Sequence, residues 1–162
     1  MKLKVARQDK YQTKKFRVEK RIVNADQLLS LTIRRPSAVS KFTIMTTKEV
    51  ANLLVKMCRD GKIEEAKEEL FTEDTLSIEP TEGFLPKETK GLMAIQKKAE
   101  LFISMVDQFY GSTITDPVVA GNYFSVGWET DIKMKGRERE TSNEICLYKV
   151  QDGKIVSEQF FY

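Results

Sequence analysis

The sequence has 162 residues, of which 41% are apolar and 31% are charged. This length and composition fit one globular domain with a tail, and they exclude a wholly disordered chain and, because no apolar run approaches about 18 residues, a membrane-spanning helix. The chain has no histidine, which excludes Ser/His and Cys/His catalysis and any histidine-ligated metal, and its two cysteines, Cys58 and Cys146, indicate reduced thiols in a cytoplasmic protein.

The net charge of +3 divides unevenly along the chain. Residues 1–44 hold 12 basic and 3 acidic residues, a net charge of +9, whereas residues 45–162 carry a net charge of −6. A basic arm can bind nucleic acid or act as a targeting peptide. This arm has no recognition helix or zinc motif, and no cleavage site follows its apolar patch, so neither role is favoured. We expect residues 1–44 to be a poorly ordered extension, or sequence upstream of a natural start at Met45.

The remaining residues, 45–162, begin with a helical region. Apolar residues recur there at spacings of three and four, which is typical of amphipathic helices. Thr46 or Thr47 can cap the first helix, Gly61 ends it, and the second helix carries glutamates on a solvent face rather than a metal site. The predicted helices cover residues 48–60, 63–71 and 91–106.

The period of the pattern changes to two after the third helix, which is typical of strands. Lys135-Gly136 and Asp152-Gly153 are hairpin signals. Strands are predicted at 75–79, 112–115, 118–134, 137–150 and 155–162, with a loop at 81–90. Helices followed by a strand meander predict the α+β class, with a curved antiparallel sheet and helices packed on one face.

Short motifs in this order resemble the nuclear transport factor 2-like superfamily, and within it the small SnoaL-like bacterial proteins related to polyketide cyclases and ketosteroid isomerases. The motifs are Gly61 with Leu70–Asp74, Ile78–Pro80, Gly91–Ile95, Glu144–Tyr148, Tyr148–Ile155 and Glu158–Tyr162. The resemblance covers residues 45–162 as one SnoaL-like domain. It implies a cystatin-like cone in which three N-terminal helices and the sheet enclose a mostly apolar cavity. It further implies a small organic ligand, no cofactor and a homodimer through the opposite face of the sheet.

Two glutamates are the candidate catalytic residues that this resemblance implies. Glu79 stands where the isomerase-like members carry a proton-shuttling carboxylate, and a carboxyl group in an apolar cavity has a raised pKa. Glu144 is the expected assisting group, and if it faces the cavity it needs a partner such as Arg139 or Lys133. Residues 53–55 are apolar where the isomerases carry a tyrosine donor, and a cysteine replaces their second, acidic donor.

Side chains on the strands are the candidate ligand contacts, with plain core or interface positions as the alternative. These candidates are Tyr123, Trp128, Cys146, Tyr148, Phe160 and Tyr162. We therefore expect a small-molecule pocket protein that either binds an apolar ligand or performs a cofactor-free isomerase-like or cyclase-like proton transfer. The alternative is a non-catalytic homodimeric binding or interaction module in which the carboxylates are structural.

Overall fold

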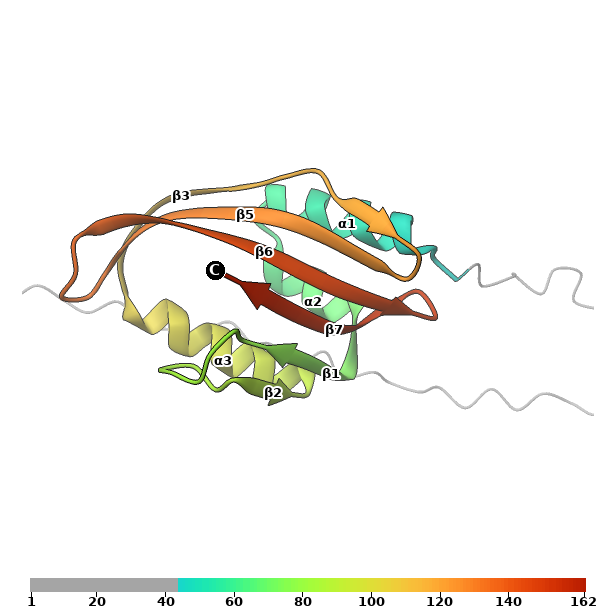
Figure 1. Ribbon diagram of the computed structural model, residues 1–162, viewed down its shortest axis with the longest axis horizontal. Helices are drawn as coiled ribbons and strands as arrows, with labels where there is room; N and C mark the ends of the chain where they lie inside the picture. Colours follow the sequence, from blue (N-terminus) through green and yellow to red (C-terminus); the bar gives the residue numbers. More distant parts are fainter. Residues whose placement is uncertain (1–43) are drawn as a thin grey trace, which may run out of the picture. The chain divides into compact units, whose positions relative to one another are not determined.

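The computed structural model describes residues 44–162, so the predicted extension at 1–44 lies outside the described residues except for Ile44. The elements in chain order are α1 (Thr47–Arg59), α2 (Ile63–Leu70), β1 (Phe71–Ile78), β2 (Glu88–Lys90), α3 (Leu92–Met105), β3 (Val106–Ile114), β4 (Val118–Ala120), β5 (Tyr123–Met134), β6 (Arg139–Gln151) and β7 (Lys154–Phe161) (Figure 1). Within this part of the chain, no helix combines the length and the apolar character needed to cross a membrane.

The start of α1 is fixed by a reciprocal pair of hydrogen bonds. The Glu49 backbone N–H donates to the Thr46 hydroxyl at 3.3 Å, and the Thr46 backbone N–H donates to the Glu49 carboxylate at 2.7 Å. This capping box satisfies two amide groups that the first helical turn leaves free. Thr46 is therefore the cap, and the predicted first helix is confirmed.

The strands form one mixed sheet with the order β2-β1-β7-β6-β5-β3, and β4 pairs with β5. All pairings are antiparallel except that of β1 with β7, which is parallel. The chain leaves β1 through β2 and α3, reaches β3, and returns through the β5–β6–β7 meander. Its last strand thereby comes beside β1 in the same direction. The predicted curved α+β architecture is confirmed, with this one parallel pairing as a difference.

The helices cover different parts of the sheet. α1 packs against β3, β4, β5 and β6, whereas α3 packs against β1 and β2. In Figure 1 the long strands β5 and β6 curve over the helices, and β7 lies between them and α3. The buried apolar core contains Val50 and Leu54 of α1, Leu70 of α2, and Phe124 and Tyr148 of the sheet. Beside α3, the same face of the sheet carries polar groups instead.

Two local features refine the predicted elements. The predicted loop at 81–90 contains the three-residue strand β2, which pairs with the end of β1. The predicted Asp152-Gly153 turn is confirmed, with φ angles of 50° and 76°. A Cβ atom at Gly153 would lie 2.9 Å from Ile44 Cγ2 and 3.0 Å from the Met45 nitrogen. Glycine is therefore required both by the turn and by the packing of Met45 on it.

Candidate functional site

A row of paired residues crosses the inner face of the sheet. Thr89 of β2 pairs with Ser77 of β1, Ser77 with Glu158 of β7, Glu158 with Tyr148 of β6, and Tyr148 with Phe124 of β5. Residues directly opposite one another share a face of the sheet. The row is therefore polar on the β2, β1 and β7 side and aromatic toward the core.

The next positions along these strands add further groups to the same face, because side chains alternate with a period of two. Glu79 follows Ser77 at the end of β1, and Phe160 of β7 pairs with Cys146 of β6. Two residues earlier on β6, Glu144 pairs with Trp128 of β5. Three glutamates from neighbouring strands thus meet on one face, and we call Ser77, Glu79, Lys98, Glu144, Glu158 and Tyr162 the polar cluster.

Lys98 enters this cluster from α3. Its ammonium nitrogen lies 2.7 Å from Glu79 Oε1 and 2.6 Å from Ser77 Oγ. The side chains of Lys98 and Glu79 are only 9% and 7% exposed, so they form a buried ion pair. The same nitrogen lies 5.1 Å from the centroid of the Phe160 ring. The charges of Lys98 and Glu79 therefore partner each other, which offsets the cost of removing them from water.

Glu144 has no such partner among the described residues. It is half-buried, and burial raises the pKa of its carboxyl group. A hydrogen bond from Cys146, with Sγ 3.6 Å from Oε1, lowers this pKa, the charges of Glu79 and Glu158 raise it further, and Lys98 lowers it. Burial also raises the pKa of the Cys146 thiol, which disfavours the thiolate form that a nucleophilic cysteine needs.

Glu158 lies deeper than Glu144 and is 5% exposed. Burial raises the pKa of its carboxyl group, while a hydrogen bond with Ser77 and the charges of Lys98 and Lys67 lower it. Glu158 also forms no ion pair within residues 44–162. The cluster therefore holds three carboxyl groups around one buried ammonium group, an arrangement that favours retention of a proton.

Tyr162 covers the solvent side of the cluster. Its hydroxyl donates to Glu79 Oε2 at 3.3 Å, although the residue as a whole is 67% exposed. Burial raises the pKa of this hydroxyl, and the negative charge of Glu79 adds to the shift. Both carboxylate oxygens of Glu79 are thus occupied, one by Lys98 and the other by Tyr162.

The structure brings most of the predicted site residues to one place. Glu79, Glu144, Cys146, Phe160 and Tyr162 lie in or beside the polar cluster, and half-buried Trp128 packs at the edge of the core opposite Glu144.

Two predicted ligand contacts do not face the site: Tyr148, although it pairs with Glu158, and Tyr123. Tyr148 is buried in the core, stacked on Phe124 at 4.8 Å between ring centroids. Tyr123 is on the outer face of β5, 40% exposed, with the Lys149 ammonium 6.0 Å from its ring.

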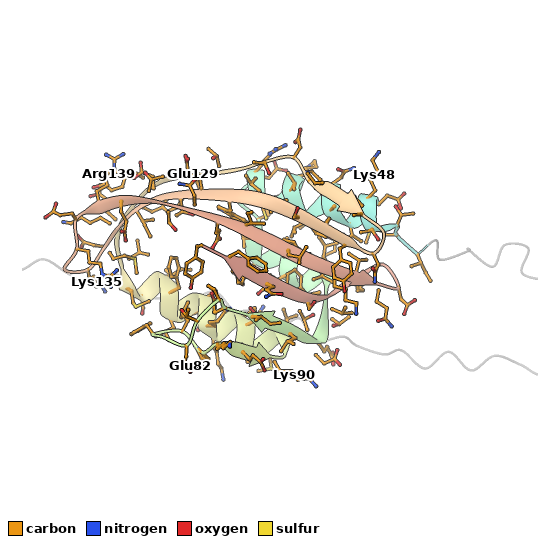
Figure 2. All side chains as sticks on the ribbon, viewed as in Figure 1. Lys48, Glu82, Lys90, Glu129, Lys135 and Arg139 are labelled. Atoms are coloured by element: carbon orange, nitrogen blue, oxygen red, sulfur yellow. The ribbon has the colours of Figure 1, made fainter. Side chains whose placement is uncertain are left out.

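The expected cationic partners of Glu144 require a correction. Arg139 donates to Asp131 at 2.8 Å and stacks on Tyr110 at 3.9 Å, and Lys133 pairs with Asp107. Arg139 is five positions from Glu144 on β6, so alternation directs the two side chains to opposite faces. Figure 2 shows Arg139 on the outward side of the β5–β6 ribbon, together with Glu129.

Two surface hollows formed by described residues lie away from the three glutamates of the polar cluster. One of about 410 Å³ is lined by Thr72, Asp74, Gln151, Asp152, Lys154 and Val156. The other, of about 220 Å³, lies between α1 and the residues that precede β4. Neither includes Glu79 or Glu144, and the space beside Glu79 is occupied by Lys98 and Tyr162.

Comparison with known families agrees with this architecture. Residues 45–162 match the SnoaL-like domain family. The chain belongs to the SnoaL-like family. No curated protein matches its sequence.

Solved structures show the same fold as this SnoaL-like domain. A Mesorhizobium loti protein provisionally assigned as a SnoaL-like polyketide cyclase has a TM-score of 0.69 at 29% identity, covering 73% of this chain and 100% of its own. A cystatin-like protein of Xanthomonas campestris has a TM-score of 0.62 at 17% identity, covering 72% and 90% of the two chains. An NTF2-like protein of Burkholderia pseudomallei has a TM-score of 0.61 at 9% identity, covering 73% and 92%. The predicted membership of the nuclear transport factor 2-like superfamily is therefore confirmed.

Sequence reasoning missed two charged residues of this SnoaL-like site, Lys98 and Glu158. Lys98 follows the buried Ile95 by three positions on α3, a spacing that places both on one face of the helix. Glu158 alternates with Phe160 and Tyr162, which were expected to face a pocket. These spacings indicate that Lys98 and Glu158 face the site. They were not used as evidence because a charged residue beside an apolar stripe is usually solvated.

Proposed function

We propose that this SnoaL-like domain binds a small organic molecule over the polar cluster and moves a proton on it without a cofactor. The family assignment supports a small-molecule role, because a relative at 29% identity is provisionally assigned as a polyketide cyclase. Isomerisation and cyclisation both begin when a base removes a proton from carbon. The required group is a carboxylate that faces the ligand and is not held by a cation.

The state of Glu144 is the observation that carries this proposal. Its carboxyl group is half-buried, it has no ion-pair partner within residues 44–162, and its pKa is raised by burial. A carboxylate with a raised pKa is a stronger base than one in water. Glu79 is instead held by Lys98 and Tyr162. We therefore assign proton transfer to Glu144 and a positioning role to Glu79, which exchanges the roles expected from the sequence.

Proton removal from 5-nitrobenzisoxazole tests this assignment without knowledge of the natural ligand. A base removes the ring C–H proton, the N–O bond breaks, and the coloured phenolate product reports the rate. Glu144→Gln removes the base and keeps the shape, so we expect the rate to fall by about a hundredfold or more. Glu129→Gln, on the exposed outer face, is the matched control. Equal rates for wild type and Glu144→Gln would overturn the proposal.

The outer face of the sheet supports a second candidate, a homodimer. Ile145 and Phe161 pair directly there and are 56% and 45% exposed, and Tyr110 and Tyr123 are each 40% exposed. Exposed apolar patches mark interaction surfaces. In this candidate the outer face of the sheet is the binding surface, and the chain performs no catalysis.

The cytoplasmic location inferred from cysteine usage stays a prediction.

A further inference from the structure

We propose that Lys98 is a ligand-binding residue whose ammonium group donates a hydrogen bond to an oxygen of the ligand and stabilises negative charge that forms there. This inference rests on the proposed proton transfer by Glu144. It assigns the opposite end of the ligand to a residue of α3 that neither the sequence motifs nor the family match identifies.

The hydrogen bonds of Lys98 leave one donor for a ligand. An ammonium group has three N–H donors. Two of them reach Ser77 Oγ and Glu79 Oε1, and within the described residues no further acceptor is bonded to this nitrogen. The Phe160 ring, at 5.1 Å, provides a cation–π contact on another side. A buried ammonium with a free donor binds an acceptor strongly, because few water molecules compete for it.

The sheet sets the distance between Lys98 and Glu144. Lys98 is held over β1 by Ser77 and Glu79, whereas Glu144 is on β6, and β7 lies between these strands. Neighbouring strands are about 4.8 Å apart, so the backbones of β1 and β6 are separated by about 10 Å. Phe160 of β7 pairs with Cys146 and lies between the two sites. A flat molecule of one or two rings can span this distance over the Phe160 ring.

The charges of the cluster select a neutral ligand. Glu79 already balances Lys98, and Glu144 and Glu158 add further negative charge when ionised. An anionic ligand would therefore be repelled. A neutral carbonyl compound gains charge only when Glu144 takes its C–H proton and the electron pair moves through the conjugated system to oxygen. Lys98, fixed in advance by Glu79, stabilises this oxygen, and return of the proton from Glu144 completes the reaction.

Binding of 4-nitrophenol tests Lys98 directly, because the absorbance of its phenolate reports the charge on the bound oxygen. Lys98→Met alone would leave Glu79 buried without a partner and risks unfolding. We therefore compare the double variant Glu79→Gln/Lys98→Met with Glu79→Gln, in which Ser77 Oγ, the glutamine amide oxygen and the nearby carboxyl groups of Glu144 and Glu158 remain as partners for Lys98. Relative to Glu79→Gln, we expect the double variant to raise the pKa of the bound phenol by about one unit. This shift corresponds to a tenfold loss of affinity for the phenolate relative to the neutral phenol. Lys97→Met, at the exposed neighbouring position, should behave as wild type.

The rates with 5-nitrobenzisoxazole separate the two proposals. If both hold, Glu144→Gln loses the rate, and the double variant is about a hundredfold slower than Glu79→Gln. If Glu144→Gln loses the rate but the double variant equals Glu79→Gln in rate and phenol pKa, the role of Lys98 is overturned and the proposed function stands. If the phenol pKa shifts but Glu144→Gln keeps its rate, the proposed function fails and the binding role of Lys98 stands.

Discussion

At the scale of single residues, the site is an unequal distribution of charge. One ammonium group, on Lys98, is shared by three carboxyl groups, and it lies closest to Glu79. Burial raises the pKa of both Glu144 and Glu158, because neither has an ion-pair partner within residues 44–162. Ionisation of Glu144 and Glu158 in the folded protein therefore costs stability, and such costs are typical of functional positions.

The stability of the Glu158→Gln variant tests this cost. The folded protein holds a proton on Glu158 above the ordinary pKa of 4.5, so wild-type stability falls as pH rises through the window between 4.5 and the raised pKa. The glutamine side chain that replaces it does not titrate. We expect the stability of the variant relative to wild type to increase from about pH 4 to about pH 8 in urea unfolding.

The control for this experiment is Glu129→Gln, since Glu129 is exposed on the outer face. Its stability difference from wild type should be nearly independent of pH. A pH-independent difference for Glu158→Gln, or one that decreases at higher pH, would show that the folded protein does not hold that carboxyl group in its neutral form.

At the scale of elements, local patterns predicted the helices and the meander of long strands. The cap at Thr46, the period of α1 and the Asp152-Gly153 turn are local signals, so they can be read from a few residues. The strand β2 was missed because three residues carry no measurable period. The parallel pairing of β1 with β7 was missed because it joins segments about 80 residues apart, and no local pattern records such a pairing.

The candidate site was predicted only in part, because local patterns place residues on a strand but do not show which distant elements pack against it. Glu79 and Glu144 came from motifs, and the strand period correctly indicates that Glu144 and Cys146 share a face. The partner of Glu79 comes from α3, and only tertiary packing brings Lys98 to β1. The suggested pairing of Glu144 with Arg139 is wrong, and the alternation of side chains on β6 was sufficient to exclude it.

At the scale of the whole molecule, the two faces of the sheet differ in the groups that they carry. The inner face holds the core and the polar cluster, and the outer face exposes Ile145 and Phe161. If the outer face forms a homodimer, Ile145→Lys places a charge in an apolar interface, and we expect at least about tenfold weaker association by sedimentation velocity. Met93→Lys, at an exposed apolar position on α3, is the control. A monomeric wild type at all concentrations would contradict the dimer.

The proposed function depends on Glu144 being a proton-transfer carboxyl group that is directed into the site. Its pKa can be measured by an NMR titration of the protein with carbon-13 labelled glutamate, in which the Glu144 signal is assigned from its loss in Glu144→Gln. We expect a midpoint above the ordinary value of 4.5 for Glu144. A Glu144 midpoint at or below 4.5 would show a solvated or ion-paired carboxylate, and it would contradict the proposed base.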